Sequence, residues 1–333
     1  MKSSLFDSIK VKVIQAPMAG GASTCQLVSA VASCGGIGSF GFAYSSPQDI
    51  STSLKETIPA GPVNANFFIF PPIQNEDLKG PIEDLYKVSR IRPPMVSPPF
   101  YPDLESQLEP VWKHRPAMVS FHFGIPVPKV ILKAKELGIL VAITATSVEE
   151  ALVISDSGAD VIVAQGIEAG GHRGTFLFEK QDEELKMLDL LSRIKSSVKT
   201  PAVGAGGVMT RKDLIRTLQT GAVAAQMGTA FITCAESGAT SAHKRYMLNG
   251  SQRETVYTKS FSGRRAQGIN NQFIKDMQGK STAAFPVQNA LTAAMRKNAV
   301  ASDDGEYQAL WAGSNYHLAK ATTVDALMNT LKI

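Results

Sequence analysis

Cysteine is scarce in this sequence, and long hydrophobic runs are missing. The 333 residues include three cysteines, Cys25, Cys34 and Cys234, and none belongs to a CxxC pair. An odd number of widely spaced cysteines argues against a disulfide framework and against a cysteine-rich metal site, so we expect no metal and a reducing compartment. No apolar run reaches the ~20 residues of a membrane span, and the N-terminus lacks the apolar stretch of a signal peptide. These absences predict a cytoplasmic protein without a membrane partner.

Charge of one sign is not concentrated anywhere along the chain. The 34 basic and 29 acidic residues leave a formal charge of +5, and the basic residues are scattered. No run resembles a nucleic-acid-binding patch, so we expect no nucleic-acid partner. The hydrophobic content of 44% is enough for a buried core, and no low-complexity tract indicates disorder. The composition predicts a soluble globular protein.

Short apolar runs alternate with segments of helical spacing. We expect eight strands, at residues 13–16, 36–40, 63–68, 117–123, 139–145, 161–165, 202–205 and 222–227. The strand-then-helix repeat indicates a parallel sheet. Ser147 precedes Glu150 by three residues, as at a helix start, and Gly138, Gly158 and Gly221 mark helix ends. Eight units favour a closed TIM (β/α)8 barrel, an α/β fold, over an open doubly wound sheet.

Two segments interrupt the repeat. Residues 70–102 contain "FPP", "RPP" and "SPPFYP", and this proline density predicts an irregular excursion after the third strand rather than a helix. Residues 235–301 form a long insertion after the eighth strand, which we expect to be partly helical and followed by a closing helix. Both follow strands, on the face where barrels carry functional loops. We therefore predict a barrel of residues 1–234 and 302–333, with a lid subdomain of residues 235–301.

Glycine-rich turns follow the last two expected strands. "GAGGV" covers residues 204–208 and "QMGT" covers residues 226–229. The loops after the seventh and eighth strands are the usual phosphate site of a barrel. Backbone N–H groups near helix N-termini favour an anion there. A single glycine-rich turn is common between a strand and a helix. Two of them, after the seventh and eighth strands, indicate a phosphate-bearing cofactor.

Amide and imidazole side chains are expected at the same mouth of the barrel. Asn66 and Gln165 can both donate and accept hydrogen bonds, which suits the edge of a flavin ring, although buried amides satisfied by their neighbours would look the same. His172 lies in the loop "EAGGHRG", which offers it little apolar packing. His122, inside "VSFHFG", is as consistent with a core residue as with a site residue. The remaining histidines are expected to face solvent: His114, His243 and His317.

Seven segments resemble, in order, the motifs of the nitronate monooxygenases, formerly called 2-nitropropane dioxygenases. They are "QAPMAGGAST", "VNANFF", "VSFHFG", "VAQGIEAGGHRGTF", "PAVGAGGV", "AAQMGTAF" and "GEYQALWAG", and they span residues 15–313. The resemblance is strongest to the group that prefers propionate 3-nitronate. It implies an FMN-containing TIM barrel that oxidises alkyl nitronates with O2, without a nicotinamide coenzyme or metal. The products would be an aldehyde or ketone plus nitrite or nitrate.

The resemblance also implies roles for individual residues. His172 falls on the catalytic histidine of the family, and His122 on a second active-site histidine. The residues expected to bind FMN are Ala16, Pro17, Met18, Asn66, Gln165, Gly170, Gly171, Gly204, Gly206, Gly207, Gln226, Met227, Gly228 and Thr229, the last four at its phosphate. The implied partners are a small anionic nitronate and O2, and the implied assembly is a monomer or homodimer.

The sequence departs from the family pattern on the lid side of the substrate pocket. Phe285 stands where a tyrosine is expected, and Ser314 and Asn315 stand where Gln-Gly-like sequences are usual. Two other functions remain open. An FMN-dependent enoyl-acyl carrier protein reductase shares the barrel and a similar "EAGGH" loop, although "QAPMAGG" and "HRGTF" favour the monooxygenase. A non-catalytic flavin-binding barrel would bind FMN without consuming O2.

Overall fold

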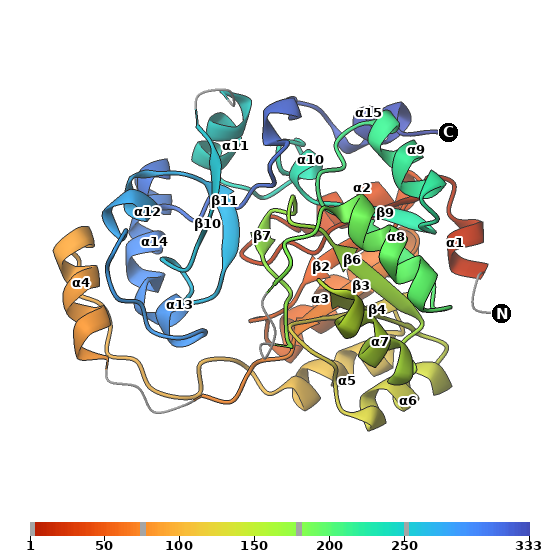
Figure 1. Ribbon diagram of the computed structural model, residues 1–333, viewed down its shortest axis with the longest axis horizontal. Helices are drawn as coiled ribbons and strands as arrows, with labels where there is room; N and C mark the ends of the chain where they lie inside the picture. The colour runs from red at the N-terminus through yellow and green to blue at the C-terminus, as the bar shows by residue number, and fades with distance from the viewer. Residues whose placement is uncertain (1–3, 74–77, 178–181, 250–252) are drawn as a thin grey trace.

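Eight parallel strands form a barrel in the computed structural model, which describes residues 4–73, 78–177, 182–249 and 253–333 (Figure 1). The strands are β1 (Val13–Gln15), β2 (Gly38–Gly41), β3 (Val63–Phe68), β4 (Met118–His122), β5 (Leu140–Ala145), β6 (Val161–Gln165), β8 (Ala202–Ala205) and β9 (Ala224–Met227). Their order is β1-β9-β8-β6-β5-β4-β3-β2, and a parallel bridge between Ile14 and Ile37 joins its two ends. All eight predicted runs are strands, and the predicted TIM barrel is confirmed.

Helices pack around the outside of the barrel. They are α2 (Cys25–Ser33), α3 (Pro47–Thr57), α5 (Leu104–His114), α6 (Pro128–Glu136), α7 (Val148–Asp156), α8 (Met187–Ser197), α9 (Arg211–Gln219) and the closing helix α15 (Val324–Thr330), which packs on α2. At the start of α7 the Ser147 hydroxyl accepts the N–H of Glu150, as predicted. No described helix has the length and apolar character needed to span a bilayer.

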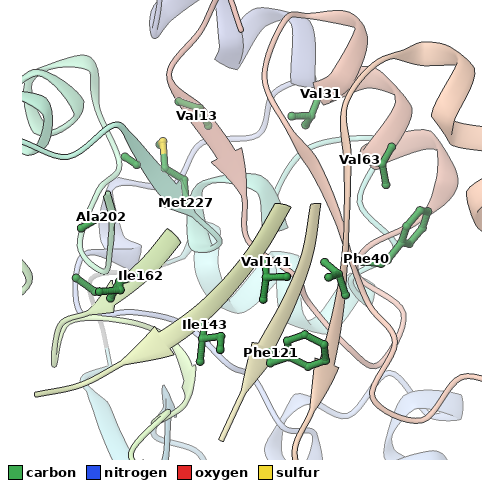
Figure 2. Packing of buried hydrophobic residues seen from close by; sticks show 14 of the residues in the cluster. Val13, Val31, Phe40, Val63, Phe121, Val141, Ile143, Ile162, Ala202 and Met227 are labelled. Carbon is green, nitrogen blue, oxygen red and sulfur yellow. The ribbon is translucent and has the colours of Figure 1, made fainter. Parts of the chain in front are cut away.

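The core has two layers because both faces of each strand are buried. Outward side chains such as Val13 and Ile162 belong to the same buried cluster as Val31 of α2, and Figure 2 labels all three. Inward side chains such as Met118 fill the barrel, where Phe6 of helix α1 (Ser4–Ser8) packs against them. Burying each large apolar side chain contributes about 1.5–3 kcal/mol. Burial on both faces explains why the strands read as continuous apolar runs.

The proline-rich excursion contains a helix, so the prediction of an irregular segment is wrong in part. Helix α4 (Lys79–Ser89) lies between β3 and α5 and accommodates Pro81 in its first turn, where the missing N–H is tolerated. Leu85 of α4 packs against Phe273 and Met277 in a hydrophobic cluster outside the barrel. A partner far along the chain therefore stabilises this helix.

The segment after β9 is partly helical, as predicted, and its later helices lie near α4 at the left of Figure 1. It contains α10 (Thr229–Ile232), α11 (Ser241–Leu248), β10 (Thr255–Thr258), β11 (Ala266–Ile269), α12 (Gln272–Asp276), α13 (Val287–Leu291) and α14 (Ala293–Ala301). Strands β10 and β11 form an antiparallel sheet with β7 (Gly171–His172), which belongs to the loop after β6. The cluster outside the barrel extends beyond residue 301 to Trp311. The lid boundary at residue 301 stays a prediction.

Candidate active site

A cavity of about 420 Å³ lies where the carboxyl ends of the strands meet the segment after β9. It brings together nearly all the residues that the sequence predicts for the site. These are Ala16, Pro17, Met18, Asn66, His122, Gln165, Gly170, Gly171, His172, Gly206, Gly207, Gln226, Met227, Gly228 and Thr229. Their common location is a structural finding, whereas their individual roles stay predictions.

Gly204 is the exception, because it does not line the cavity. A Cβ at this position would lie 2.6 Å from Thr217 Cγ2 and 2.7 Å from Met187 Sδ, so this glycine makes room for helices α8 and α9. The motif "GAGG" places several glycines in one short stretch, and the alternation of a strand turns the first of them away from the mouth. The predicted cofactor contact of Gly204 is corrected accordingly.

The turn after β8 exposes backbone donors to the cavity. Gly206 and Gly207 have φ of +123° and +71°, values that L side chains rarely adopt. Within the described chain, the N–H groups of these two residues donate to no other group. Asn315 holds the turn in place, because its Nδ2 donates to the carbonyl of Gly207 at 2.8 Å. Asn315 is thus a support of the turn on the cofactor side rather than only a residue of the lid.

The start of helix α9 does not supply donors to this site. Thr210 and Asp213 form a capping box, and the Asp213 carboxylate accepts the N–H of Met209 at 3.2 Å and of Thr210 at 3.0 Å. At this turn the donors without acceptors in the described chain belong to Gly206 and Gly207. The contribution of a helix N-terminus stays a prediction for the turn after β9, where Gly228 is the N-cap of helix α10 (Thr229–Ile232).

The turn after β9 adds two more backbone donors. The N–H groups of Gly228 and Thr229 have no acceptor among the described residues, and the Thr229 hydroxyl accepts the N–H of Gly313 at 3.0 Å. Successive N–H groups that converge without acceptors form a concave anion site. Together with the turn after β8, this donor set fits the phosphate of a bound cofactor.

The two predicted amides, Gln165 and Asn66, differ in how many of their hydrogen-bonding atoms already have partners in the protein. Gln165 donates from Nε2 to the carbonyl of His172 at 3.0 Å and accepts the N–H of Gly174 at 2.7 Å, so both ends of its amide hold the loop after β6. Asn66 donates from Nδ2 to the Ser120 hydroxyl at 2.9 Å. Its Oδ1 accepts no hydrogen bond within the described chain. Asn66 is the amide with an acceptor left for a ligand.

The loop that carries His172 is paired rather than free. His172 and Gly171 lie opposite Ala266 and Gln267 in the β7–β11 ladder. A Cβ on Gly170 would lie 2.5 Å from the carbonyl carbon of Ala312, so glycine lets two backbone segments meet there. The glycine-rich composition therefore reflects a closely packed loop, which holds the imidazole of His172 in one place.

The two predicted histidines make different contacts. His122 donates from Nε2 to the carbonyl of His172 at 3.2 Å, because a carbonyl can only accept, and its Nδ1 lies 3.0 Å from the Thr144 hydroxyl. Both ring nitrogens of His122 are therefore engaged. His172 contacts the Ser262 hydroxyl through Nε2 at 2.8 Å, and its Nδ1 has no partner among the described residues. His172 is the histidine with a nitrogen available to a ligand.

Both histidines are neutral imidazoles at neutral pH. Burial is the main cause that lowers the pKa of His122 and of His172 to about 3. The positive charge of Arg264 acts in the same direction on both, and at His172 so does the neighbouring His122. A neutral imidazole carries one donor and one acceptor, so His172 can either donate or accept a single hydrogen bond at Nδ1.

Aromatic rings surround His172. Ring centroids of Phe68, Phe123, Phe285 and Trp311 lie 6.2, 5.8, 5.8 and 5.5 Å from that of His172. Phe285, the departure from the family pattern, contributes its ring to this wall but no hydroxyl. Of these four rings, Phe68 and Trp311 also line the cavity, so part of the cavity surface beside the imidazole is apolar.

The prediction that three other histidines face solvent is only partly right. His317 is exposed, but His114 is half-buried with Nε2 2.8 Å from the Ser51 hydroxyl. His243 lines the cavity, and its Nε2 lies 3.1 Å from the carbonyl of Trp311. Burial lowers the pKa of His243 to about 4.

Sequence reasoning also missed two polar side chains in the cavity wall, Tyr44 and Arg296. Tyr44 follows β2, where no motif marks it. Arg296 lies on α14, in a segment outside the strand–helix repeat. A lone basic residue in a helical insertion carries no signal that separates it from a solvent-facing one.

Comparison with known proteins agrees with this geometry. The family model for nitronate monooxygenase matches residues 2–332. The chain belongs to the nitronate monooxygenase family. The resemblance recognised from the motifs is thereby confirmed at the family level, and the protein is an oxidoreductase whose general reaction is the flavin-dependent oxidation of nitronates.

Individual relatives of this nitronate monooxygenase support the assignment. A probable nitronate monooxygenase of Staphylococcus haemolyticus is 34% identical, over 97% of this chain and 94% of its own length. One from Staphylococcus aureus strain MRSA252 is 33% identical with the same coverage. The crystal structure of a nitroalkane oxidase from Streptomyces ansochromogenes superposes with a TM-score of 0.90 at 32% identity, covering 99% of this chain and 96% of that one.

More distant structures share the fold alone. FabK from Thermotoga maritima superposes with a TM-score of 0.77 at 23% identity, covering 99% of this chain and 93% of that one. Within the described part of this chain, no group of three or more His, Cys, Asp or Glu side chains is arranged to hold a metal ion.

Proposed function

We propose that this enzyme binds FMN and oxidises propionate 3-nitronate with O2, releasing an aldehyde plus nitrite or nitrate. The observation that carries the proposal is that four backbone N–H groups share one cavity with Nδ1 of His172, and none of these five groups has a partner among the described residues. These donors belong to Gly206, Gly207, Gly228 and Thr229. They suit the phosphate of FMN, and the aromatic wall around His172 suits a small alkyl nitronate.

FMN supplies the chemistry of electron transfer from the nitronate to O2. A nitronate is already deprotonated, so the protein does not need a strong base. His172 binds and orients the nitro group through Nδ1, and His122 holds the backbone of His172 in position. The rings of Phe68 and Trp311, which line the cavity beside His172, offer an apolar surface to the alkyl part of the substrate.

Oxidation of a neutral nitroalkane would require His172 to act as a base as well as to bind the nitro group. Its α-proton must be removed before oxidation, and His172 is the cavity side chain suited to accept it. The low pKa of about 3 makes His172 a weak base, although an available one at neutral pH. We therefore propose that preformed nitronates are the preferred substrates.

The rival function is reduction of an enoyl thioester by an FMN enzyme on the same barrel. One observation separates the two reactions. Under anaerobic conditions a reductase bleaches its flavin rapidly with NADH or NADPH, whereas a nitronate oxidase bleaches it with the nitronate. Visible spectra of the purified protein with each reagent, followed by O2 uptake, test the proposal. Bleaching by the nicotinamide alone would support the reductase, and no response to either would support a flavin-binding barrel without activity.

The cofactor itself has a direct test. Heat release and mass spectrometry should recover FMN at one per chain. Recovery of FAD, or a colourless protein that FMN does not reconstitute, would contradict the proposal. We also propose that the enzyme works in the cytoplasm as a monomer or homodimer, which is consistent with its three free cysteines. Residues 235–301 are proposed as its lid.

A further inference from the structure

Arg296 is a cation held in the wall of the substrate cavity. It lies on α14, and its guanidinium is oriented by its own neighbours along the chain. Nε donates to the Thr292 hydroxyl at 3.2 Å, and Nη2 donates to the backbone carbonyl of Asn289 at 2.8 Å and to its side-chain oxygen at 2.9 Å. These bonds leave Nη1 without an acceptor in the described chain. The guanidinium is therefore held in one orientation, and the N–H groups of Nη1 remain available to a ligand.

No carboxylate of the described residues forms a salt bridge with this guanidinium. The salt bridges among the described residues involve other arginines and lysines, and none includes Arg296. Burial lowers the pKa of Arg296, which reflects the cost of keeping a charge away from water. Charges in such surroundings are usually paired. An anionic ligand would supply the missing partner.

Arg296 and His172 line the same cavity. The charge of Arg296 is also the last of the causes that lower the pKa of His172. Tyr44 lines the cavity as well, and Arg296 and Tyr44 are electrostatic neighbours of each other. The Tyr44 hydroxyl has no hydrogen-bond partner in the described chain. The cavity wall thus contains a guanidinium and a phenol as well as the imidazole of His172.

We propose that Arg296, assisted by Tyr44, binds the carboxylate of the substrate and selects nitronates that carry a second negative charge. This inference rests on the proposed function. The planar guanidinium matches the geometry of a carboxylate, and a charge-assisted hydrogen bond away from water is stronger than a neutral one. His172 contacts the nitro end, while Arg296 receives the carboxylate end. A nitronate of similar length without a carboxylate leaves the guanidinium unpaired and loses this interaction.

The test compares two substrates and two matched variants. Propionate 3-nitronate carries the carboxylate, and propyl-1-nitronate does not. Arg296→Gln removes the cavity charge, while Lys297→Gln removes the same charge from the exposed neighbour on α14. Arg296→Gln should lower kcat/KM for propionate 3-nitronate by at least about tenfold and leave propyl-1-nitronate within about twofold. Lys297→Gln should change neither value, and Arg296→Lys should recover part of the loss.

A binding measurement separates this inference from the proposed function. Succinate resembles the dianionic substrate and cannot be oxidised in the same way, and butyrate has one charge fewer. Calorimetry on the flavin-loaded enzyme should find succinate bound more tightly than butyrate, and Arg296→Gln should remove the difference. If the wild-type enzyme consumes no nitronate, the proposed function fails, while succinate binding still decides the role of Arg296.

Three results would overturn the role of Arg296 while leaving the reaction intact. Equal losses for both nitronates would make Arg296 a general structural residue. Loss of FMN from Arg296→Gln would assign the guanidinium to the cofactor instead. Equal affinity of the wild-type enzyme for succinate and butyrate would show that no second charge is recognised.

Discussion

The hydroxyl of Ser262 lies 2.8 Å from Nε2 of His172 and 3.1 Å from the carbonyl of Arg264. When the hydroxyl donates to the carbonyl, Nε2 must carry the proton of the imidazole, and Nδ1 is an acceptor. When the hydroxyl turns to donate to Nε2, Nδ1 carries the proton and becomes a donor. Ser262 therefore allows one histidine to present either an acceptor or a donor to the cavity. A nitronate oxygen selects the donor form.

Replacing His172 tests this contact directly. His172→Ala should keep its fold and FMN and lose at least about tenfold in kcat/KM for propionate 3-nitronate, because a charge-assisted hydrogen bond is lost in the transition state. His172→Asn should recover part of the loss, since an amide still donates. O2 uptake over a range of nitronate concentrations, with flavin content measured on each variant, provides the comparison. Unchanged kcat/KM in a fully flavinated His172→Ala enzyme would contradict a catalytic role for His172 and make His122 the next candidate.

Removing the Ser262 hydroxyl should have a smaller effect of the same kind. Ser262→Ala leaves Nε2 of His172 without its partner, and a neutral hydrogen bond contributes about 0.5–1.5 kcal/mol. We expect kcat/KM to fall by roughly two- to twelvefold with flavin content unchanged. Combining Ser262→Ala with His172→Ala should cost no more than His172→Ala alone, because the hydroxyl acts through the imidazole. Additive losses in the double variant would indicate a direct contact between Ser262 and the substrate.

The phosphate end of the cavity has its own test at Gly228. A Cβ there meets one neighbouring atom, Ala16 Cβ at 3.2 Å, and φ is not positive, so the backbone tolerates a side chain. Gly228→Leu should nevertheless lower FMN retention more than it lowers the melting temperature, because the side chain displaces the phosphate from the N–H groups. Gly228→Ala, the matched control, should retain more FMN. Full flavin content in Gly228→Leu would make this an ordinary turn.

The free energy of unfolding should already fall between about pH 6.5 and 5, at a pH above the range in which most carboxylates titrate. The pKa of His243 is about 4 in the folded protein and about 6.5 in an unfolded chain. Below pH 6.5 the unfolded state binds a proton that the folded state does not, so the free energy of unfolding falls as the pH falls. Each such histidine contributes a slope of up to about 1.4 kcal/mol per pH unit.

His243→Gln isolates one of these contributions. The amide can still donate to the Trp311 carbonyl but does not titrate. Urea unfolding of both proteins between pH 6.5 and 5 should give a smaller pH dependence for the variant. Identical slopes would mean that His243 is protonated as easily in the folded protein as in the unfolded chain.

The barrel could be predicted from the sequence because its signals are local. Each strand is a short apolar run buried on both faces, and helix boundaries such as Ser147 are marked by neighbouring residues. The same is true of site residues such as Asn66, which lies within β3, and His172, which lies in the loop after β6. Their place at the mouth follows from the strand to which each belongs or which precedes it.

The parts that sequence could not predict depend on contacts between distant segments. Helix α4 lies in a proline-rich stretch and is stabilised by Phe273, and His243 is drawn into the cavity wall by Trp311. Gly204 looks like its neighbours Gly206 and Gly207, but it lies within β8 and faces the helices. Local pattern carries none of this information.

The pairing of β7 with β11 also sets an order of events during synthesis. All eight barrel strands leave the ribosome before β11, and Trp311 follows later still. N-terminal segments generally fold first as a chain emerges. Asn315, which supports the turn of Gly207, is made later again. Neither the glycine turn nor the loop of His172 therefore has its full set of contacts until synthesis of the chain is nearly complete.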